Sequence, residues 1–146
     1  MTRLLRPAMV VTLLLASCAP GTAPHGPAIA PPPTDTFWRA EDIGGGGIID
    51  RSHVTLALAT DSSASGSAGC NRFAGRYALT GDRLTLAGIA STKKACAPSL
   101  MEQEARYIAM LADVVRWRIE LTGALVLTTK KGARLHFFPD EVLRPR

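Results

Sequence analysis

The chain has 146 residues and a formal net charge of +5 at neutral pH, a length that fits one domain of ordinary size. The first seventeen residues contain two arginines and no acid, so the remainder carries a formal charge of only +3. This small excess argues against a nucleic-acid-binding protein, which normally concentrates its basic residues in one patch.

The N-terminal segment predicts export. Two arginines precede an apolar run from Ala8 to Ala16, as in a secretory signal peptide, and the run is too short to span a membrane. Leu15-Ala16-Ser17-Cys18 follows directly and resembles the bacterial lipobox. We therefore expect residues 1–17 to be removed and Cys18 to carry the lipid anchor. The alternative is an ordinary cleaved signal that happens to contain a cysteine.

The segment behind Cys18 predicts a tether. Residues 18–36 are dominated by Pro, Ala and Gly and contain almost no large apolar side chains, so they cannot bury enough surface to fold. Ala19 in the second position favours the outer membrane over inner-membrane retention, by resemblance to known sorting behaviour. We expect a lipid-anchored protein that faces the periplasm, with a domain over residues 37–140 and a tail over 141–146.

Alternating hydrophobicity dominates the domain and predicts antiparallel strands. The pattern occurs over residues 53–60, where Val54, Leu56 and Leu58 would share one face, and again over 77–79 and 84–86, which a glycine turn would join. It returns over residues 116–121, 124–129 and 133–138, where the expected buried residues are Trp117, Ile119, Leu121, Leu125, Leu127, Leu135 and Phe137. The sequence thus predicts an antiparallel meander.

One segment, from about residue 100 to 114, has helical spacing instead. Ser99 and Glu102 have the spacing of a capping box, and Glu102 with Arg106 would form a favourable i,i+4 pair. The expected apolar stripe contains Met101, Ala105, Ile108, Leu111, Ala112 and Val115. We interpret Met101, Tyr107 and Met110 as core residues rather than as the lining of a ligand pocket.

The cysteines favour a disulfide. With Cys18 assigned to lipid, Cys70 and Cys96 form an even pair in an exported chain, which is most simply a bond between them. A catalytic Cys70 would need a base in reach, and His53 and His136 lie on predicted strands without a recognisable supporting pattern. The histidines and cysteines also lack the paired spacing of a zinc site. We expect neither a metal nor another cofactor.

Together, five segments resemble the META domain family of HslJ-like proteins. They are Trp38 near the domain start, SGSAGCNRFAGRY, GDRLTLAGIASTKKAC, MEQEARYIAML and LTGALVLTTKKGARLHF, in that order. The resemblance implies a mainly β fold, a strongly bent antiparallel sheet resembling a partial barrel with one helix packed against it. The family positions carried over are Gly69, Cys70, Asn71, Arg72, Phe73, Gly75, Thr92, Cys96 and Glu102.

These motif positions have structural interpretations. Gly69 and Gly75 suit turns or bulges, Asn71 can bond neighbouring backbone, and Phe73 and Tyr77 are expected in the core. Arg72 would either bind an anionic ligand or bond loop carbonyls, and the sequence leaves both open. The chain departs from the family pattern after Thr92, where a lysine pair replaces the usual hydrophobic residue.

The resemblance implies an envelope lipoprotein connected with stress and antibiotic tolerance, with no catalytic activity or cofactor attached to the domain. Since fold alone does not supply an activity, the sequence favours a non-enzymatic protein that binds an envelope protein or a cell-wall component. The alternative is a small-ligand binder that uses the concave face of the bent sheet.

Overall fold

The computed structural model describes residues 31–140, and in this part the chain forms eight strands and one helix. The elements in chain order are β1 (Phe37–Ile43), β2 (Thr55–Leu58), β3 (Ser63–Ser67), β4 (Arg72–Thr80), β5 (Arg83–Ser91), α1 (Pro98–Ala112), β6 (Val114–Ile119), β7 (Leu125–Thr129) and β8 (Arg134–Pro139). The predicted signal peptide, Cys18, most of the predicted tether and the tail lie outside the described residues.

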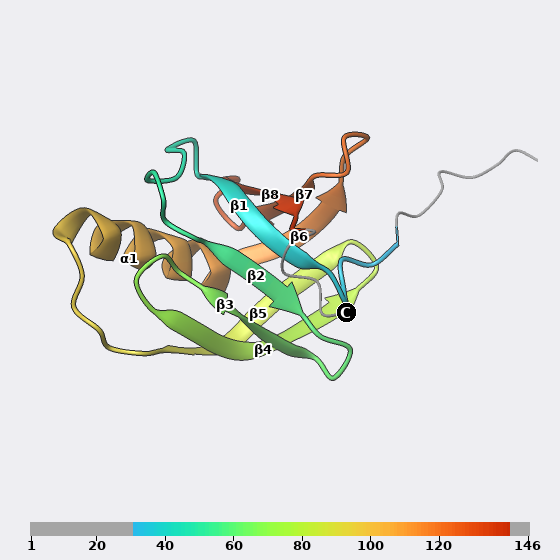
Figure 1. Ribbon diagram of the computed structural model, residues 1–146. Helices are drawn as coiled ribbons and strands as arrows, with labels where there is room; N and C mark the ends of the chain where they lie inside the picture. Colours follow the sequence, from blue (N-terminus) through green and yellow to red (C-terminus); the bar gives the residue numbers. More distant parts are fainter. Residues whose placement is uncertain (1–30, 141–146) are drawn as a thin grey trace, which may run out of the picture.

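Each strand pairs antiparallel with the next, and β1 also pairs with β8, so the sheet closes into a barrel. α1 lies beside one end of the barrel, after a long connection from β5 (Figure 1). The predicted mainly β fold with one helix is confirmed, and the bent sheet curves far enough to close on itself. Of the strands, β1 and β3 were not predicted.

The barrel interior is filled by apolar side chains. An eight-stranded barrel has an interior just wide enough for its own side chains. The residues that alternation placed on one face are inside, among them Val54, Leu56 and Leu58. The core also contains Trp38, Ala40, Ile43, Ala64, Ala68, Phe73, Leu84, Leu86, Tyr107, Leu111, Val114, Trp117, Leu125, Leu127, Leu135 and Phe137. Leu121 is a correction, because β6 ends at Ile119 and Leu121 is fully exposed beyond it.

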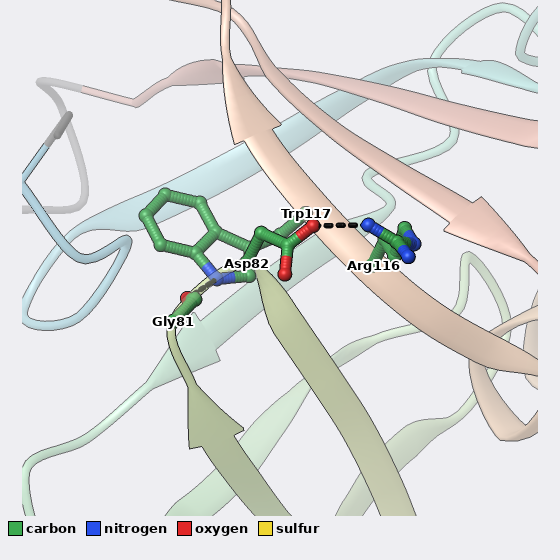
Figure 2. A network of polar contacts seen from close by, with 4 residues as sticks. All are labelled: Gly81, Asp82, Arg116 and Trp117. Atoms are coloured by element: carbon green, nitrogen blue, oxygen red, sulfur yellow. Dashed lines mark hydrogen bonds and ion pairs between the residues drawn. The ribbon is translucent and has the colours of Figure 1, made fainter. Parts of the chain in front are cut away.

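The seam between β5 and β6 closes the barrel over a short stretch. The predicted glycine turn joins β4 to β5, and beside it Arg83 of β5 pairs in register with Arg116 of β6. The Trp117 indole Nε1 donates to the Gly81 carbonyl at 2.9 Å, and the Trp117 amide donates to the Asp82 carbonyl at 3.0 Å. An ion pair between Arg116 and Asp82 completes the contact (Figure 2). One buried tryptophan thus fastens the strand after the helix to the hairpin before it.

α1 differs from the sequence prediction at its start. The predicted capping box is wrong: Ala97 is the N-cap, no side chain caps the helix, and a proline occupies its first turn. Proline suits that position because it has no N–H to leave unsatisfied. Glu102 is accordingly not a capping residue, and it is exposed to solvent. Among the described residues, no helix has the length and apolar character needed to cross a membrane.

The buried face of α1 also differs from the predicted stripe. Gln103, Tyr107 and Leu111 are the buried residues of the helix, whereas Met101 is 47% exposed. Tyr107 lies in the core as predicted, with its ring edge-on to Phe73 at a centroid distance of 5.8 Å. The helix is therefore rotated relative to the predicted stripe, and it leaves an apolar edge in contact with solvent.

Candidate functional site

Most of the motif residues gather where the chain enters β4, close to α1. Gly69 has φ +101°, a conformation that L side chains rarely adopt, and a Cβ there would come within 3.0 Å of the Gln103 Nε2 atom. Phe73 is buried as predicted. Gly75 faces an irregularity in the β4–β5 pairing, and a Cβ on it would meet the Ala87 carbonyl at 3.0 Å. The glycines therefore permit close approach of α1 and β5 to this turn.

Asn71 is the centre of a polar cluster, here called the Asn71 cluster, which consists of Asn71, Thr92, Lys94 and Glu104. Asn71 is only 4% exposed. Its Oδ1 accepts from the Thr92 Oγ1 and from the Lys94 amide, both at 2.7 Å. Its Nδ2 donates to the Lys94 carbonyl at 3.2 Å and to Glu104 Oε1 at 3.1 Å. The side-chain amide thereby uses both its donors and its acceptor.

The Asn71 cluster corrects one interpretation of Asn71. We expected its side chain to bond neighbouring backbone, but its backbone partner is Lys94, 23 positions away. The Asn71 amide itself donates to Glu104 Oε2 at 2.8 Å. One side chain therefore links the start of β4, the connection behind β5 and the helix.

Glu104 is a site residue that the sequence analysis missed. Glu102 was carried over from the family motif, yet Glu104 is the helix carboxylate that accepts both bonds from Asn71. The signal that could have found it is helical spacing. Glu104 lies three positions before the buried Tyr107, which places it beside the buried face of α1.

The predicted disulfide is present between Cys70 and Cys96, with an S–S distance of 2.01 Å. It joins the residue before Asn71 to the segment that leads into α1, so it reinforces the same contact as the Asn71 cluster. Both sulfurs are engaged in the bond, and Cys70 is therefore not a thiolate nucleophile in this structure. Within residues 31–140, no group of three or more His, Cys, Asp or Glu side chains is arranged to hold a metal ion.

Two more polar side chains of α1 anchor it over the barrel end. Gln103 is buried, accepts from the Ile49 amide at 2.8 Å and donates to the Ser52 hydroxyl at 2.9 Å. The Tyr107 hydroxyl donates to the Thr55 carbonyl at 3.1 Å. Burial raises the pKa of Tyr107 above its ordinary value, because the phenolate would lose its hydration. These buried bonds fix the rotation of the helix.

The glycine run at 44–47 binds its own chain. The Asp42 carboxylate accepts from the Gly45 amide at 2.7 Å and from the Gly47 amide at 2.8 Å. These two amides are therefore already bonded within the loop, so they are not open donors of the kind that bind a phosphate group.

A groove of about 570 Å³ lies next to the Asn71 cluster, and we call it the α1 groove. The helix contributes the edge that its rotation leaves exposed, and the connection behind β5 contributes the lysine pair. The lining residues are Asn71, Ser91, Lys93, Lys94, Ala95, Met101, Glu104, Ala105, Ile108 and Ala109. Apart from Glu104, the helix side of the groove is thus apolar, and the side formed by the connection is basic.

Arg72 points to a different part of the surface. It is exposed at the start of β4 and lines a depression of about 580 Å³ that shares no lining residue with the α1 groove. Its backbone amide donates to the Thr92 Oγ1 at 3.3 Å. Among the described residues its guanidinium bonds no loop carbonyl, which was one of the two roles considered for it.

Comparison with known proteins places these features in a family. The family model of the META domain matches residues 32–142. An NMR structure of a protein from Burkholderia xenovorans is 24% identical with a TM-score of 0.60, covering 82% of this chain and 98% of its own. A second NMR structure is 26% identical with a TM-score of 0.59, covering 75% of this chain and 93% of its own.

A crystal structure of a DUF4847 family protein from Bacteroides vulgatus has the same fold at 13% identity, with a TM-score of 0.54 and coverage of 73% of this chain and 93% of its own. No curated protein matches the chain significantly. The family model spans most of the sequence, including the Asn71 cluster, the disulfide and all of the barrel. On this basis the chain belongs to the META domain family.

Proposed function

We propose that this protein is a non-enzymatic envelope lipoprotein, anchored in the outer membrane through Cys18, whose META domain binds another envelope component. Its role would be to support envelope integrity or tolerance of stress and antibiotics. The observation that carries the proposal is how the motif residues are used. Asn71, Thr92 and Glu104 bond one another and the Lys94 backbone. These three polar side chains are thus used to hold the helix and the connection behind β5 in place, and they support the surface that these two segments form.

The α1 groove is the surface that this cluster supports. Met101 is a large apolar side chain that remains about half exposed, and Ile108 is only partly buried further along the helix. Lys93 and Lys94 line the same groove and are exposed. An apolar strip beside two cations is complementary to a protein segment that places an aliphatic side chain next to an acidic one. We therefore assign the partner as an envelope protein with such a segment.

The alternative of a small ligand on the concave face of the sheet requires an open interior. That face is the inside of the barrel, and it is filled by side chains such as Leu56, Leu127 and Phe137, which are fully buried. We therefore propose that binding takes place on the outer surface of the domain.

The membrane anchor can be tested with a single substitution. Cys18→Ser removes the acylated residue, so the protein should move from the membrane fraction to the soluble periplasmic fraction. The comparison is made by fractionation, with the unaltered chain as control. Retention of the variant on membranes, with residues 1–17 cleaved off, would show that another feature anchors the protein.

The groove can be tested by complementation. A strain that lacks the protein should take up an antibiotic that the intact envelope excludes, and the unaltered chain should restore the exclusion of that antibiotic. Full-chain variants Met101→Glu and Lys93→Glu with Lys94→Glu should fail to restore exclusion, because they place charge on the apolar strip or reverse the basic one. Arg134→Glu is the matched control, since Arg134 is exposed on β8 outside the groove. Equal restoration by all the variants, at equal protein levels, would remove the groove from the proposal.

A further inference from the structure

The depression beside Arg72 is a second concave surface, and the α1 groove does not account for it. It is formed by the outward-facing residues of the first three strands together with the start of β4 and the end of the domain. Its lining residues are Phe37, Arg39, His53, Thr55, Ala57, Ser65, Gly66, Ser67, Arg72 and Asp140. A volume of about 580 Å³ lies in the range of small-molecule sites.

The floor of the depression is built from small side chains. The outward residues of β2 and β3 are Thr55, Ala57, Ser65 and Ser67, with Gly66 between the two serines. Gly66 has no room for a side chain, because a Cβ on it would lie 2.1 Å from the Thr55 carbonyl oxygen. The close packing at Gly66 holds β3 against β2, and the small side chains of Thr55, Ala57, Ser65 and Ser67 leave room for a ligand to lie close to the backbone of the two strands. Phe37 also lines the depression.

The charges around this floor favour an anion. Arg72 is exposed, and among the described residues its guanidinium has no hydrogen-bond or ion-pair partner. Arg39 lies 4.0 Å from Glu41, with both side chains more than half exposed, a geometry that contributes little binding energy. His53 is exposed and lines the same wall. The lining contains two guanidinium groups, of Arg39 and Arg72, and one carboxylate, of Asp140, so its formal charge is positive.

By contrast, other arginines on the barrel surface have partners in the structure. Arg116 pairs with Asp82, Arg118 with Glu120, and the Arg76 guanidinium donates to the Asp61 carbonyl at 3.2 Å. Guanidinium groups bind carboxylates and phosphates through two parallel hydrogen bonds. Unlike these three arginines, Arg72 has no such partner among the described residues, and it lines a hollow large enough for a ligand.

We propose that this depression binds a small oxyanion, a carboxylate or phosphate carried on a ring of about monosaccharide size. Arg72 and Arg39 hold the charged group, and the ring lies on the small-residue floor next to Phe37. The site is separate from the partner surface of the α1 groove, so either one can fail in experiment without the other.

The test is calorimetric titration of the full-length protein in detergent with three sugars at equal ionic strength. Glucuronate carries a carboxylate, glucose phosphate carries a phosphate, and glucose carries neither. We expect saturable binding of at least one acid and none of glucose. Binding of glucuronate alone identifies a carboxylate site, binding of glucose phosphate alone identifies a phosphate site, and binding of both identifies a general oxyanion site.

Two variants locate the binding. Arg72→Gln should weaken it roughly tenfold or more, the usual effect of losing a hydrogen bond to a charged group, whereas Arg134→Gln on β8 should leave it unchanged. Ser65→Phe, which fills the floor from an exposed position, should abolish it. Equal affinity in Arg72→Gln and Arg134→Gln, equal binding of glucose, or no binding of either acid would each overturn the proposal.

Discussion

Asn71 and Arg72 are neighbours in the chain, yet they belong to two regions with opposite character. Asn71 is buried and its side-chain amide bonds Thr92, Lys94 and Glu104. Arg72 is exposed, and among the described residues its guanidinium bonds nothing. Asn71 lies in the bend just before β4, whereas Arg72 is the first residue of the strand. Because successive side chains of a strand point to opposite faces of the sheet, Arg72 lies on the outer face and the next residue, Phe73, is buried in the core.

This contrast shows how one short motif can serve both architecture and recognition. Buried polar groups are costly unless fully bonded, so the Asn71 cluster fixes the position of α1 and of the lysine pair. An exposed arginine contributes little to folding and remains available for a ligand. Substitutions in the Asn71 cluster should therefore lower the stability of the fold, whereas substitution of Arg72 should weaken ligand binding and leave stability nearly unchanged.

Among the substitutions near the Asn71 cluster, removal of the disulfide should cause the largest loss in the free energy of unfolding. Replacing Cys70 and Cys96 with serine opens a loop with a sequence separation of 26, which in the chain-entropy model costs about 3.5 kcal/mol. Urea denaturation of the double variant measures the loss. A thiol count by mass spectrometry is the companion experiment, since the unaltered chain should have no free thiol at Cys70 or Cys96 before reduction.

Asn71→Ala should be nearly as harmful, with a loss of about 3 kcal/mol in the free energy of unfolding. The substitution removes the side-chain partner of Glu104 Oε1, of the Thr92 hydroxyl and of the Lys94 backbone in a partly buried site. Each unsatisfied group costs about 1–3 kcal/mol, while the backbone amide of residue 71 still donates to Glu104 Oε2. Arg72→Ala is the matched control and should change stability by less than about 0.5 kcal/mol. If the two substitutions cost the same, the contrast between these neighbours is wrong.

The two glutamates of α1 provide a smaller and more discriminating test. Glu104→Ala removes the carboxylate that accepts two bonds from Asn71 and should cost about 2 kcal/mol. Glu102→Ala removes an exposed carboxylate without a described partner and should be close to neutral. Thermal melting of both variants decides which one supports the motif, and a larger loss at Glu102 would favour the role expected from the sequence.

The sequence was sufficient to predict most of the barrel, because its strands bury aliphatic residues at every second position. It did not predict β3, whose residues Ser63–Ser67 are small and mostly polar and pair only because β2 and β4 lie on either side. The disulfide followed from the count of cysteines in a chain that we expect to be exported. The strands could be predicted because alternation is a local pattern, and the disulfide could be predicted because it depends on the number of cysteines and on the expected oxidising compartment.

The candidate site was harder to predict, because its contacts join distant parts of the chain. Gln103 is a polar residue whose burial depends on bonds to Ile49 and Ser52, more than 50 positions away. The Ser99 and Glu102 spacing matched a capping box, but the helix begins earlier, with Ala97 as its N-cap. A one-dimensional pattern cannot show which face of a helix finds polar partners, and the helix rotation that opens the α1 groove therefore required the structure.

Alkaline pH provides the mildest test of the buried side, through Tyr107. Burial raises its pKa in the folded protein above the ordinary value of 10.0, so its stabilising contribution is complete below pH 10 and declines as the pH rises further. In that range the unfolded chain loses the phenolic proton while the folded chain keeps it, and stability should fall by about 1.4 kcal/mol per pH unit. Tyr107→Phe should be less stable at neutral pH by about 1 kcal/mol, through loss of the bond to Thr55, but it should lose much less stability above pH 10.

Tyr77 is the internal comparison, because its pKa is raised by its partial burial and by Asp35 and Asp61. Tyr77→Phe should consequently alter the alkaline slope less than Tyr107→Phe, and denaturant titrations of the three proteins across this pH range measure the difference. An equal alkaline slope in the unaltered chain and in Tyr107→Phe would mean that the helix anchor opens before the rest of the barrel unfolds.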